Sequence, residues 1–253
     1  MTNKNWASTL RRSLTLLSLL ALWETGAQVG WLDPFYFPPP SQVWEVMFTL
    51  AASGELWPHL GATAVAASAG LVIGLGLGIG LGFAAALSPI LAELLEPVMI
   101  LLNAIPRVIL APLFVIWLGI GLASKLALAT VLVSVLLFFS VYNGIKEVDR
   151  RLIERIRTLG GGRRTLIREL YLPSVTAWIM GNFKVAVGFA FTGAVVGEFV
   201  ASSRGLGYLL QFAQSTYNAA LTIALVVIIM AFVLLLFAIA ERLERHLLSW
   251  RYV

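Results

Sequence analysis

The feature that most constrains this chain is a series of long stretches without a single Asp, Glu, Lys or Arg. Three of them cover residues 56–92, 126–145 and 205–240. A helix that crosses the hydrocarbon core of a bilayer needs about 20 apolar residues, so each stretch is long enough to span a membrane. Charged residues make up only 12% of the sequence, about half the share found in soluble domains. The sequence therefore predicts an all-α protein that crosses a membrane several times.

Weaker apolar segments complete the predicted bundle. Two are interrupted by one cation each, Arg107 and Lys184, and the first contains Glu24. The sequence predicts a polytopic bundle of six transmembrane helices, over residues 13–32, 60–87, 94–118, 123–144, 174–198 and 217–240. We expect residues 13–253 to form one transmembrane domain behind a short N-terminus of residues 1–12. No small-residue cleavage site follows the first apolar segment, which favours an uncleaved helix over a signal peptide.

The distribution of cations predicts the orientation. With six spans, both termini and the 145–172 loop lie on one side, and these segments hold fourteen of the eighteen Lys and Arg residues. Lys125 and Arg204 are the two that fall on the other side. Because cytoplasmic loops carry the excess of positive charge, we expect a multi-pass protein of a bacterial inner membrane with both termini cytoplasmic. The net charge of +5 is then a topology signal and not a nucleic-acid patch.

The predicted outer connection between the first two spans contains a proline-rich run at residues 35–40. Such a run is unsuited to a helix. Ser41 is predicted to cap a short helix that ends near Ala52. The aromatic side chains of this loop suit the membrane interface, and a docking role for an external partner remains an alternative.

Several kinds of chemistry lack the residues they need. The sequence has no cysteine and only two histidines, His59 and His246, so we expect no metal site and no catalytic residue, although a membrane-embedded enzyme remains a less favoured alternative. The glycines of the second predicted span match neither G-x-G-x-x-G nor G-x-x-x-x-G-K-[ST]. They instead form overlapping G-x-x-x-G spacings, which allow close helix packing in lipid, within the chain or across a dimer. These glycines are Gly70, Gly74, Gly76, Gly78, Gly80 and Gly82.

The 145–172 loop has the pattern of two short helices separated by glycines. Leu152, Ile156 and Leu159 recur at helical spacing among cations. Residues 160–162 are three glycines that break this helix, and a second apolar pattern resumes at 163–170 before the next span. The pattern alone also fits a basic amphipathic helix on the membrane surface.

The same loop resembles a known sequence motif. The cytoplasmic loop of binding-protein-dependent ABC importer permeases carries E-A-A-x(3)-G-x(9)-I-x-L-P. The residues at its anchor positions here are Glu154, Gly160, Leu170, Leu172 and Pro173. Arg155 and Ile156 replace the two alanines, and Leu170 replaces the isoleucine.

Two further stretches are similar to the nitrate, sulfonate, taurine and bicarbonate branch of this family. Residues 103–121 resemble its third span, and residues 202–208 resemble the outer loop before its last helix. The likeness covers about residues 55–250.

The resemblance implies a MetI-like architecture with a cytoplasmic coupling helix. It implies the membrane subunit of an importer that moves a small anionic solute, such as nitrate, bicarbonate or an organic sulfonate, by alternating access. Such a subunit is not an enzyme and holds no cofactor, because separate ATPase subunits bind ATP and Mg. The other implied partners are a periplasmic or extracellular solute-binding protein, a second permease copy in a homodimer or heterodimer, and membrane lipid. The residues implied in coupling are Glu154, Leu159, Gly160, Gly161, Leu170, Leu172 and Pro173. A passive channel or a membrane scaffold is the competing interpretation.

Charges inside the predicted spans suggest a solute path. A cation at the bilayer centre costs about 2.5–3.5 kcal/mol on insertion scales, so Arg107 and Lys184 must face protein or water. Asn103 precedes Arg107 by four residues, which predicts one shared helix face. With Glu198 these residues form our candidate path, and the proline-containing segment 103–113 is the candidate gate. The structural alternatives are a Lys184–Glu198 pair and an Arg107 contact with a carbonyl freed by a proline.

Overall fold

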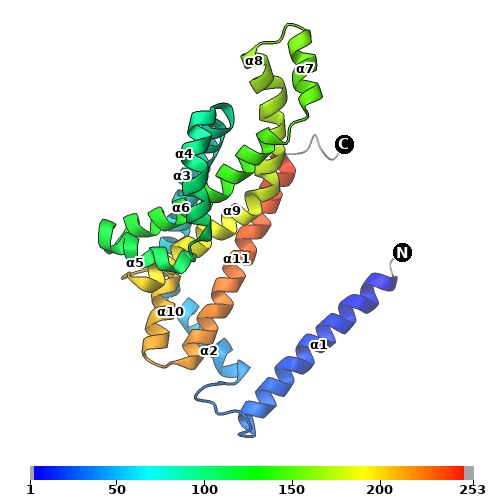
Figure 1. Ribbon diagram of the computed structural model, residues 1–253. Helices are drawn as coiled ribbons and strands as arrows, with labels where there is room; N and C mark the ends of the chain where they lie inside the picture. The colour runs from blue at the N-terminus through cyan, green and yellow to red at the C-terminus, as the bar shows by residue number, and fades with distance from the viewer. Residues whose placement is uncertain (1–2, 248–253) are drawn as a thin grey trace. The chain divides into compact units, whose positions relative to one another are not determined.

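The computed structural model describes residues 3–247, without the side chains of residues 3–9, Arg107 and 246–247. Within this range the chain forms eleven α-helices and one π-helical turn, with no strand, which confirms the all-α prediction. The elements are α1 (Asn3–Gln28), α2 (Pro40–Ala52), α3 (Leu56–Leu87), α4 (Pro89–Ala104), α5 (Arg107–Leu118), α6 (Leu122–Lys146), α7 (Arg150–Thr158), α8 (Arg163–Leu166), η1 (Ile167–Tyr171), α9 (Leu172–Val200), α10 (Leu206–Ser215) and α11 (Ala219–Leu247) (Figure 1).

The helices divide into two compact units. One contains residues 1–58 and 209–230, and the other contains residues 59–208 and 231–253. The larger unit includes α4 to α9 complete and most of α3. All of the candidate coupling and path residues lie in this larger unit.

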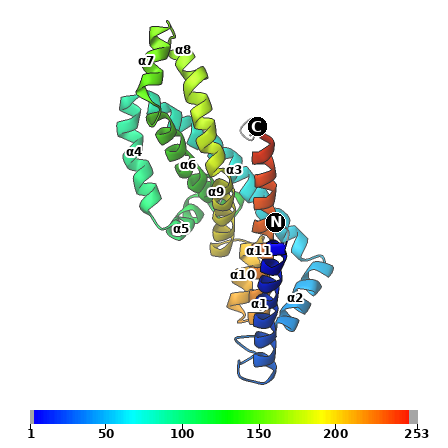
Figure 2. The same cartoon turned by 90° about the vertical axis from the view of Figure 1, so that its right-hand side faces the viewer.

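Four described helices are long and apolar enough to cross a membrane, over Leu56–Leu87, Leu122–Lys146, Arg163–Val200 and Ala219–Arg245. They correspond to four of the predicted spans. The predicted span 94–118 is instead two helices, α4 and α5, bent by 111° (Figure 2). The bend falls at Pro106, because proline disfavours a helical conformation at the preceding residue and has no N–H to donate. If the bent pair counts as one broken span, there are five.

The six-span count is not confirmed. Residues 13–28 are helical as part of α1, but Ser, Thr and Glu24 interrupt the apolar run, so α1 is not among the helices apolar enough to span. Glu24 has another task in the smaller unit. Its carboxylate accepts hydrogen bonds from the Ser41 N–H at 2.9 Å and the Ser41 hydroxyl at 2.7 Å. Our prediction that Ser41 caps α2 is therefore wrong, because Pro40 occupies the first turn and Glu24 supplies the acceptor.

The centre of the larger unit is α6, most of whose residues are buried. Small residues on α3 let this helix approach closely. The glycines on the contact face are Gly70, Gly74, Gly78 and Gly82. A Cβ added at Gly74 would stand 2.6 Å from the Cβ of Val133 on α6, whereas one added at Gly76 or Gly80 would meet nothing within 4 Å. The prediction of close packing is confirmed for the first set of glycines, while Gly76 and Gly80 face outward.

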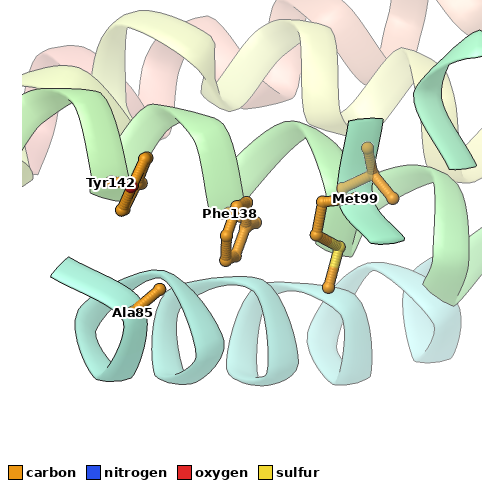
Figure 3. Packing of buried hydrophobic residues seen from close by; sticks show 5 residues of the cluster. Ala85, Met99, Phe138 and Tyr142 are labelled. Carbon is orange, nitrogen blue, oxygen red and sulfur yellow. The ribbon is translucent and has the colours of Figure 1, made fainter. Parts of the chain in front are cut away.

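Apolar side chains complete the core around α6. Phe138 and Tyr142 stack at 5.5 Å between ring centroids and pack with Ala85 of α3 and Met99 of α4 (Figure 3). On another side, α6 packs most extensively against α9, where Ala186 and Ala190 are buried against Val133 and Leu137. These contacts make α6 the helix on which α3, α4 and α9 converge.

The segment 163–200 is one continuous helical rod made of α8, η1 and α9. We expected the span at 174–198 to be separate from the helical pattern at 163–170, and this is wrong. Pro173 cannot donate to the carbonyl four residues earlier, and the wider π turn accommodates the loss, with the Leu172 N–H donating to the Ile167 carbonyl. At 1.5 Å per residue the rod is about 57 Å long.

The glycine face of α3 yields a stability prediction. Gly74→Ala forces the added methyl group into Val133, and overpacking of this kind costs about 1–3 kcal/mol. We expect a lower thermal unfolding midpoint for the variant in detergent, measured by circular dichroism. Gly80→Ala is the matched control, because its methyl group enters open space and alanine favours the helix. Equal midpoints for the two variants would contradict the packing assignment.

Candidate functional site

The hairpin formed by α7 and α8 lies at one end of the larger unit, beyond the neighbouring ends of α3, α4 and α6 (Figures 1 and 2). The sequence dictates both ends of α7. At its start the Asp149 carboxylate accepts a hydrogen bond from the Arg151 N–H at 2.8 Å. At its end the Gly160 N–H donates to the Arg157 carbonyl and the Gly161 N–H donates to the Ile156 carbonyl. This pair of bonds is a Schellman cap.

The three hinge glycines have different tasks. Gly160 adopts φ +81°, the left-handed conformation that the cap requires. At Gly161 an added Cβ would stand 2.5 Å from Cγ2 of Ile156, so a side chain there opens the cap. At Gly162 an added Cβ would meet nothing within 4 Å. The predicted helix–glycine–helix arrangement is confirmed, and its first two glycines form a tight, fixed turn.

Apolar side chains of this hairpin are exposed. Leu152 is 45% and Leu159 is 79% exposed, although apolar surface at a loop tip is costly in water. Ile156, the third residue of the predicted face, is half-buried beside Gly161. Glu154 is exposed on the same helix. The hairpin thus presents leucines among cations at a surface that nothing within the described chain covers.

The remaining coupling candidates lie at the base of the hairpin. Leu170 is half-buried in η1, while Leu172 and Pro173 are exposed at the start of α9. Buried Leu166 and Val175 anchor this region to the larger unit, where Val175 packs against Val141 and Ile145 of α6. These contacts connect the base of the hairpin to the α6–α9 pair.

The candidate path residues do not form one group. Asn103 lines a cavity of about 200 Å³ between α4, α6 and α9. Its lining residues are Leu102, Asn103, Val131, Leu132, Val135, Leu136, Phe139 and Phe189. The Leu102 carbonyl at this site has lost its helical partner, since Pro106 has no N–H. The cavity therefore combines apolar and aromatic walls with the Asn103 amide.

Arg107 and Asn103 do not share a helix. Asn103 belongs to α4 and Arg107 begins α5 beyond the bend, so the expected shared face is wrong. The Arg107 side chain lies outside the described part of the structure, and its role in the path stays a prediction.

Lys184 and Glu198 have separate partners, so the Lys184–Glu198 pair that we considered is wrong. The Lys184 Nζ lies 3.8 Å from an Oε atom of Glu241 and 5.4 Å from the Phe237 ring centroid. Lys184 is exposed. Its ion pair joins α9 to α11.

Glu198 is the centre of a buried polar cluster near the end of α9 opposite the hairpin, and it is 1% exposed. Its Oε2 accepts hydrogen bonds from the Thr63 hydroxyl at 2.8 Å and the Gly207 N–H at 3.1 Å. Lys125 of α6 lies with its Nζ 4.0 Å from the other carboxylate oxygen. The Lys125 Nζ also donates to the Arg204 carbonyl at 3.0 Å.

The loop 202–208 folds closely around this carboxylate. Gly205 adopts φ +124°, and a Cβ there would overlap the Glu198 carboxyl group. The Gly205 N–H donates to Nδ1 of His59 at 3.1 Å, and the Leu206 N–H donates to the Thr63 hydroxyl at 2.9 Å. We name the set of His59, Thr63, Lys125, Glu198 and loop 202–208 the Glu198 cluster. Sequence reasoning missed it, although Lys125 and Glu198 each border a long apolar stretch and the glycines of 205–207 signal close approach.

Comparison with known proteins shows the family of the chain. A family model described as "Binding-protein-dependent transport system inner membrane component" matches residues 74–249, well over half of the chain. The chain belongs to this family of permeases. It is a multi-pass membrane protein and the transport subunit of an ABC importer. The matched range contains the hairpin and most of the Glu198 cluster.

Named relatives of this permease transport several kinds of solute. The riboflavin transport system permease of Chloroflexus aurantiacus is 36% identical over 237 residues, covering 94% of this chain and 88% of the relative. The taurine permease of Escherichia coli is 30% identical, and the alignment covers 93% of this chain and 88% of the relative. The formylaminopyrimidine permease of Halalkalibacterium halodurans is 32% identical and covers 96% of each chain.

Solved structures share the fold. The permease resembles a chain of the MetNI methionine ABC transporter in an inward-facing conformation, with a TM-score of 0.59, 24% identity and coverage of 76% of this chain and 93% of that one. A chain of an amino acid ABC transporter gives a TM-score of 0.62 at 17% identity. The match covers 79% of this chain and 98% of that one. These similarities confirm the predicted MetI-like fold.

The Glu198 cluster yields a second stability prediction. Glu198→Ala leaves Lys125 buried without an anion, and breaking a buried pair in this way costs about 3–5 kcal/mol. We expect a marked loss of thermal stability, measured by fluorescence-detected size-exclusion chromatography after heating. The paired replacement of Lys125→Met and Glu198→Met removes both charges and is expected to unfold at a higher temperature than Glu198→Ala. If the paired variant is the less stable one, the two charges do not interact as described.

Proposed function

We propose that the α7–α8 hairpin is the coupling element through which separate ATPase subunits drive alternating access in this permease. The observation that carries the proposal is the exposed apolar tip, with Leu152 and Leu159 uncovered among cations outside the apolar spans. Such a surface fits a cleft in a protein partner. The coupling candidates Glu154, Gly160 and Gly161 lie on α7 or in its cap.

The connection to the transmembrane helices supports a mechanical role. The cap fixes the turn after α7, and the following rod of α8, η1 and α9 is continuous. A push on the hairpin therefore moves α9 as a body relative to α6. In an alternating-access cycle, ATP binding biases the two states through such differential contacts.

The proposed assembly follows from this role. The hairpin and both termini face the cytoplasm, in line with the cation distribution. The ATPase partners hold ATP and Mg, and this chain contributes no ATP site and no catalytic residue. A solute-binding protein delivers solute at the opposite side. Two copies of this chain form the pathway, and a heterodimer with a related permease is the alternative.

For the solute, we propose a small organic molecule, with an organic sulfonate as the first candidate. The taurine and aliphatic sulfonate permeases of Escherichia coli, each 30% identical, support this class. A planar heterocycle is the second candidate. The riboflavin relative and the Phe139 and Phe189 side chains in the cavity wall favour it.

The coupling proposal is tested at the glycine cap. Gly160→Val cannot adopt the left-handed conformation and disrupts the end of α7. We expect loss of solute uptake and of solute-stimulated ATP hydrolysis in proteoliposomes that contain the complete transporter. Gly162→Ala is the matched control and keeps both activities, since its methyl group meets nothing. Glu154→Ala is expected to reduce both activities less than Gly160→Val.

Membrane insertion and co-purification of the permease copies are measured in parallel. Loss of uptake with intact insertion supports a coupling defect. Uptake at the wild-type rate from Gly160→Val would remove the hairpin from the mechanism.

The solute class is tested by competition. Proteoliposomes with the complete transporter are offered taurine or riboflavin, and ATP-dependent uptake of each is measured with and without an excess of the other. Uptake of taurine that riboflavin does not inhibit is expected for the sulfonate class. Uptake of riboflavin that taurine does not inhibit would instead indicate a planar heterocycle as the solute.

A further inference from the structure

The proposed coupling mechanism uses the hairpin but leaves the Glu198 cluster at the opposite end of α9 without a role. We infer that Lys125 is a two-position cation that controls the tip of loop 202–208. In the described state it holds the Arg204 carbonyl, and in the other state it moves to Glu198 and releases the tip. The inference rests on the proposed alternating-access function and names positioning residues for it.

Lys125 has one close acceptor in the described state. Its Nζ donates to the Arg204 carbonyl at 3.0 Å, whereas Oε1 of Glu198 at 4.0 Å is beyond hydrogen-bonding distance. Lys125 is only 6% exposed. An ammonium group this deeply buried cannot replace a lost acceptor with bulk water. Its hydrogen bond must therefore go to the Arg204 carbonyl oxygen or to Oε1 of Glu198.

Glu198 offers the second position. Its Oε2 receives both close donors, from Thr63 and Gly207. Its Oε1 is buried and has no hydrogen-bond partner within the described residues. A buried carboxylate oxygen without a donor is costly, and a shift of about 1 Å by the Lys125 Nζ would satisfy it. The described state therefore holds the loop while leaving an equivalent acceptor open.

The geometry of the loop determines which part is released. Residues 205–207 stay attached in either state, because their N–H groups bond to His59, Thr63 and Glu198. The tip of 202–204 is attached to the helices through the Arg204 carbonyl, and its Ser203 and Arg204 are exposed. Gly205, at φ +124°, separates the pinned part from the tip. Loss of the Lys125 bond thus detaches the tip from α6, keeps the Ser202–Arg204 hydrogen bonds within the tip, and leaves residues 205–207 in place.

The packing of α6 against α9 links this choice to the hairpin. Gly197 lies against the Lys125 backbone, where a Cβ would stand 3.2 Å from the Lys125 Cα, and Gly193 packs on Ala129 in the same way. At these two positions α9 has no side chain between its backbone and α6, so none of its side chains there blocks a small shift along α6. Because Glu198 is on the same continuous rod as the hairpin, such a shift directly changes the Lys125–Glu198 distance. Small displacements of this kind are sufficient to switch packed interfaces between two arrangements.

The test uses a cysteine placed at the tip, since the chain has no cysteine of its own. Ser203→Cys is introduced into the complete transporter in proteoliposomes. Its reaction rate with a membrane-impermeant maleimide is measured without nucleotide and after trapping with ATP and vanadate. We expect the two rates to differ by about tenfold, the population change that one lost hydrogen bond to a charged group can produce. Ser53→Cys, on an exposed segment outside the cluster, is the control and should show no dependence on Lys125.

Two replacements in the Ser203→Cys background separate a switch from a static ion pair. Lys125→Met removes the donor, so the tip should label rapidly in both states. Glu198→Gln removes the anion that attracts Lys125, so the tip should stay held and label slowly in both states. If Lys125 and Glu198 instead form a static ion pair, both variants should change the labelling rate of Ser203→Cys in the same direction. Lys125→Arg is the conservative variant and should retain the difference between the two states.

The outcomes also separate this inference from the coupling proposal. State-independent labelling of Ser203→Cys in a transporter that still shows ATP-driven uptake would overturn the switch and leave the coupling role intact. Parallel shifts of Lys125→Met and Glu198→Gln would overturn it as well. If either variant no longer co-purifies with the ATPase subunits, the comparison of Lys125→Arg with the parent decides. A labelling rate of Ser203→Cys that still differs between the two states in Lys125→Arg supports the switch, and equal rates in the two states overturn it.

Discussion

The close approach of backbones at α6 is the interaction on which the rest of the structure depends. Apolar side chains gain little from association when the solvent is lipid, so helix contacts rely on close packing. Here glycines on both neighbours meet α6 along its length, as Gly74 meets Val133 and Gly193 meets Ala129. This packing sets the register between α6 and α9 in the described state. The register in turn places Lys125 opposite Glu198 and Val175 beside Val141.

The same packing gives the larger unit two functional ends joined by one rod. At one end, a capped turn carries exposed leucines on a short basic helix. At the other, a buried carboxylate organises loop 202–208. The π turn at 167–171 keeps the rod continuous past Pro173, where an ordinary helix would lose a hydrogen bond. Continuity matters because a break there would absorb the movement of the hairpin before it reached Glu198.

The broken segment between α4 and α5 provides a different kind of site. Pro106 interrupts the helical hydrogen bonding beside Asn103, and the neighbouring cavity is lined by the Asn103 amide and by aromatic and apolar side chains. Irregular backbone at membrane depth is tolerated where protein or a water-filled cavity satisfies it. This region is therefore suited to a solute path, while Lys184, paired with Glu241, takes part in joining α9 to α11.

The sequence by itself determined the helical class, four of the spans and the helix–glycine–helix hairpin, because these depend on local composition and spacing. Charge-free runs of 20 or more residues and a glycine triplet after a short amphipathic pattern have few structural interpretations. The tertiary structure alone decided the partners of the buried charges. Lys125 and Glu198 are far apart in sequence, and only the register of α6 on α9 brings them together. It also decided the break at Pro106 and the continuity at Pro173, since a proline interrupts a helix or is accommodated by it according to the packing and turn geometry around it.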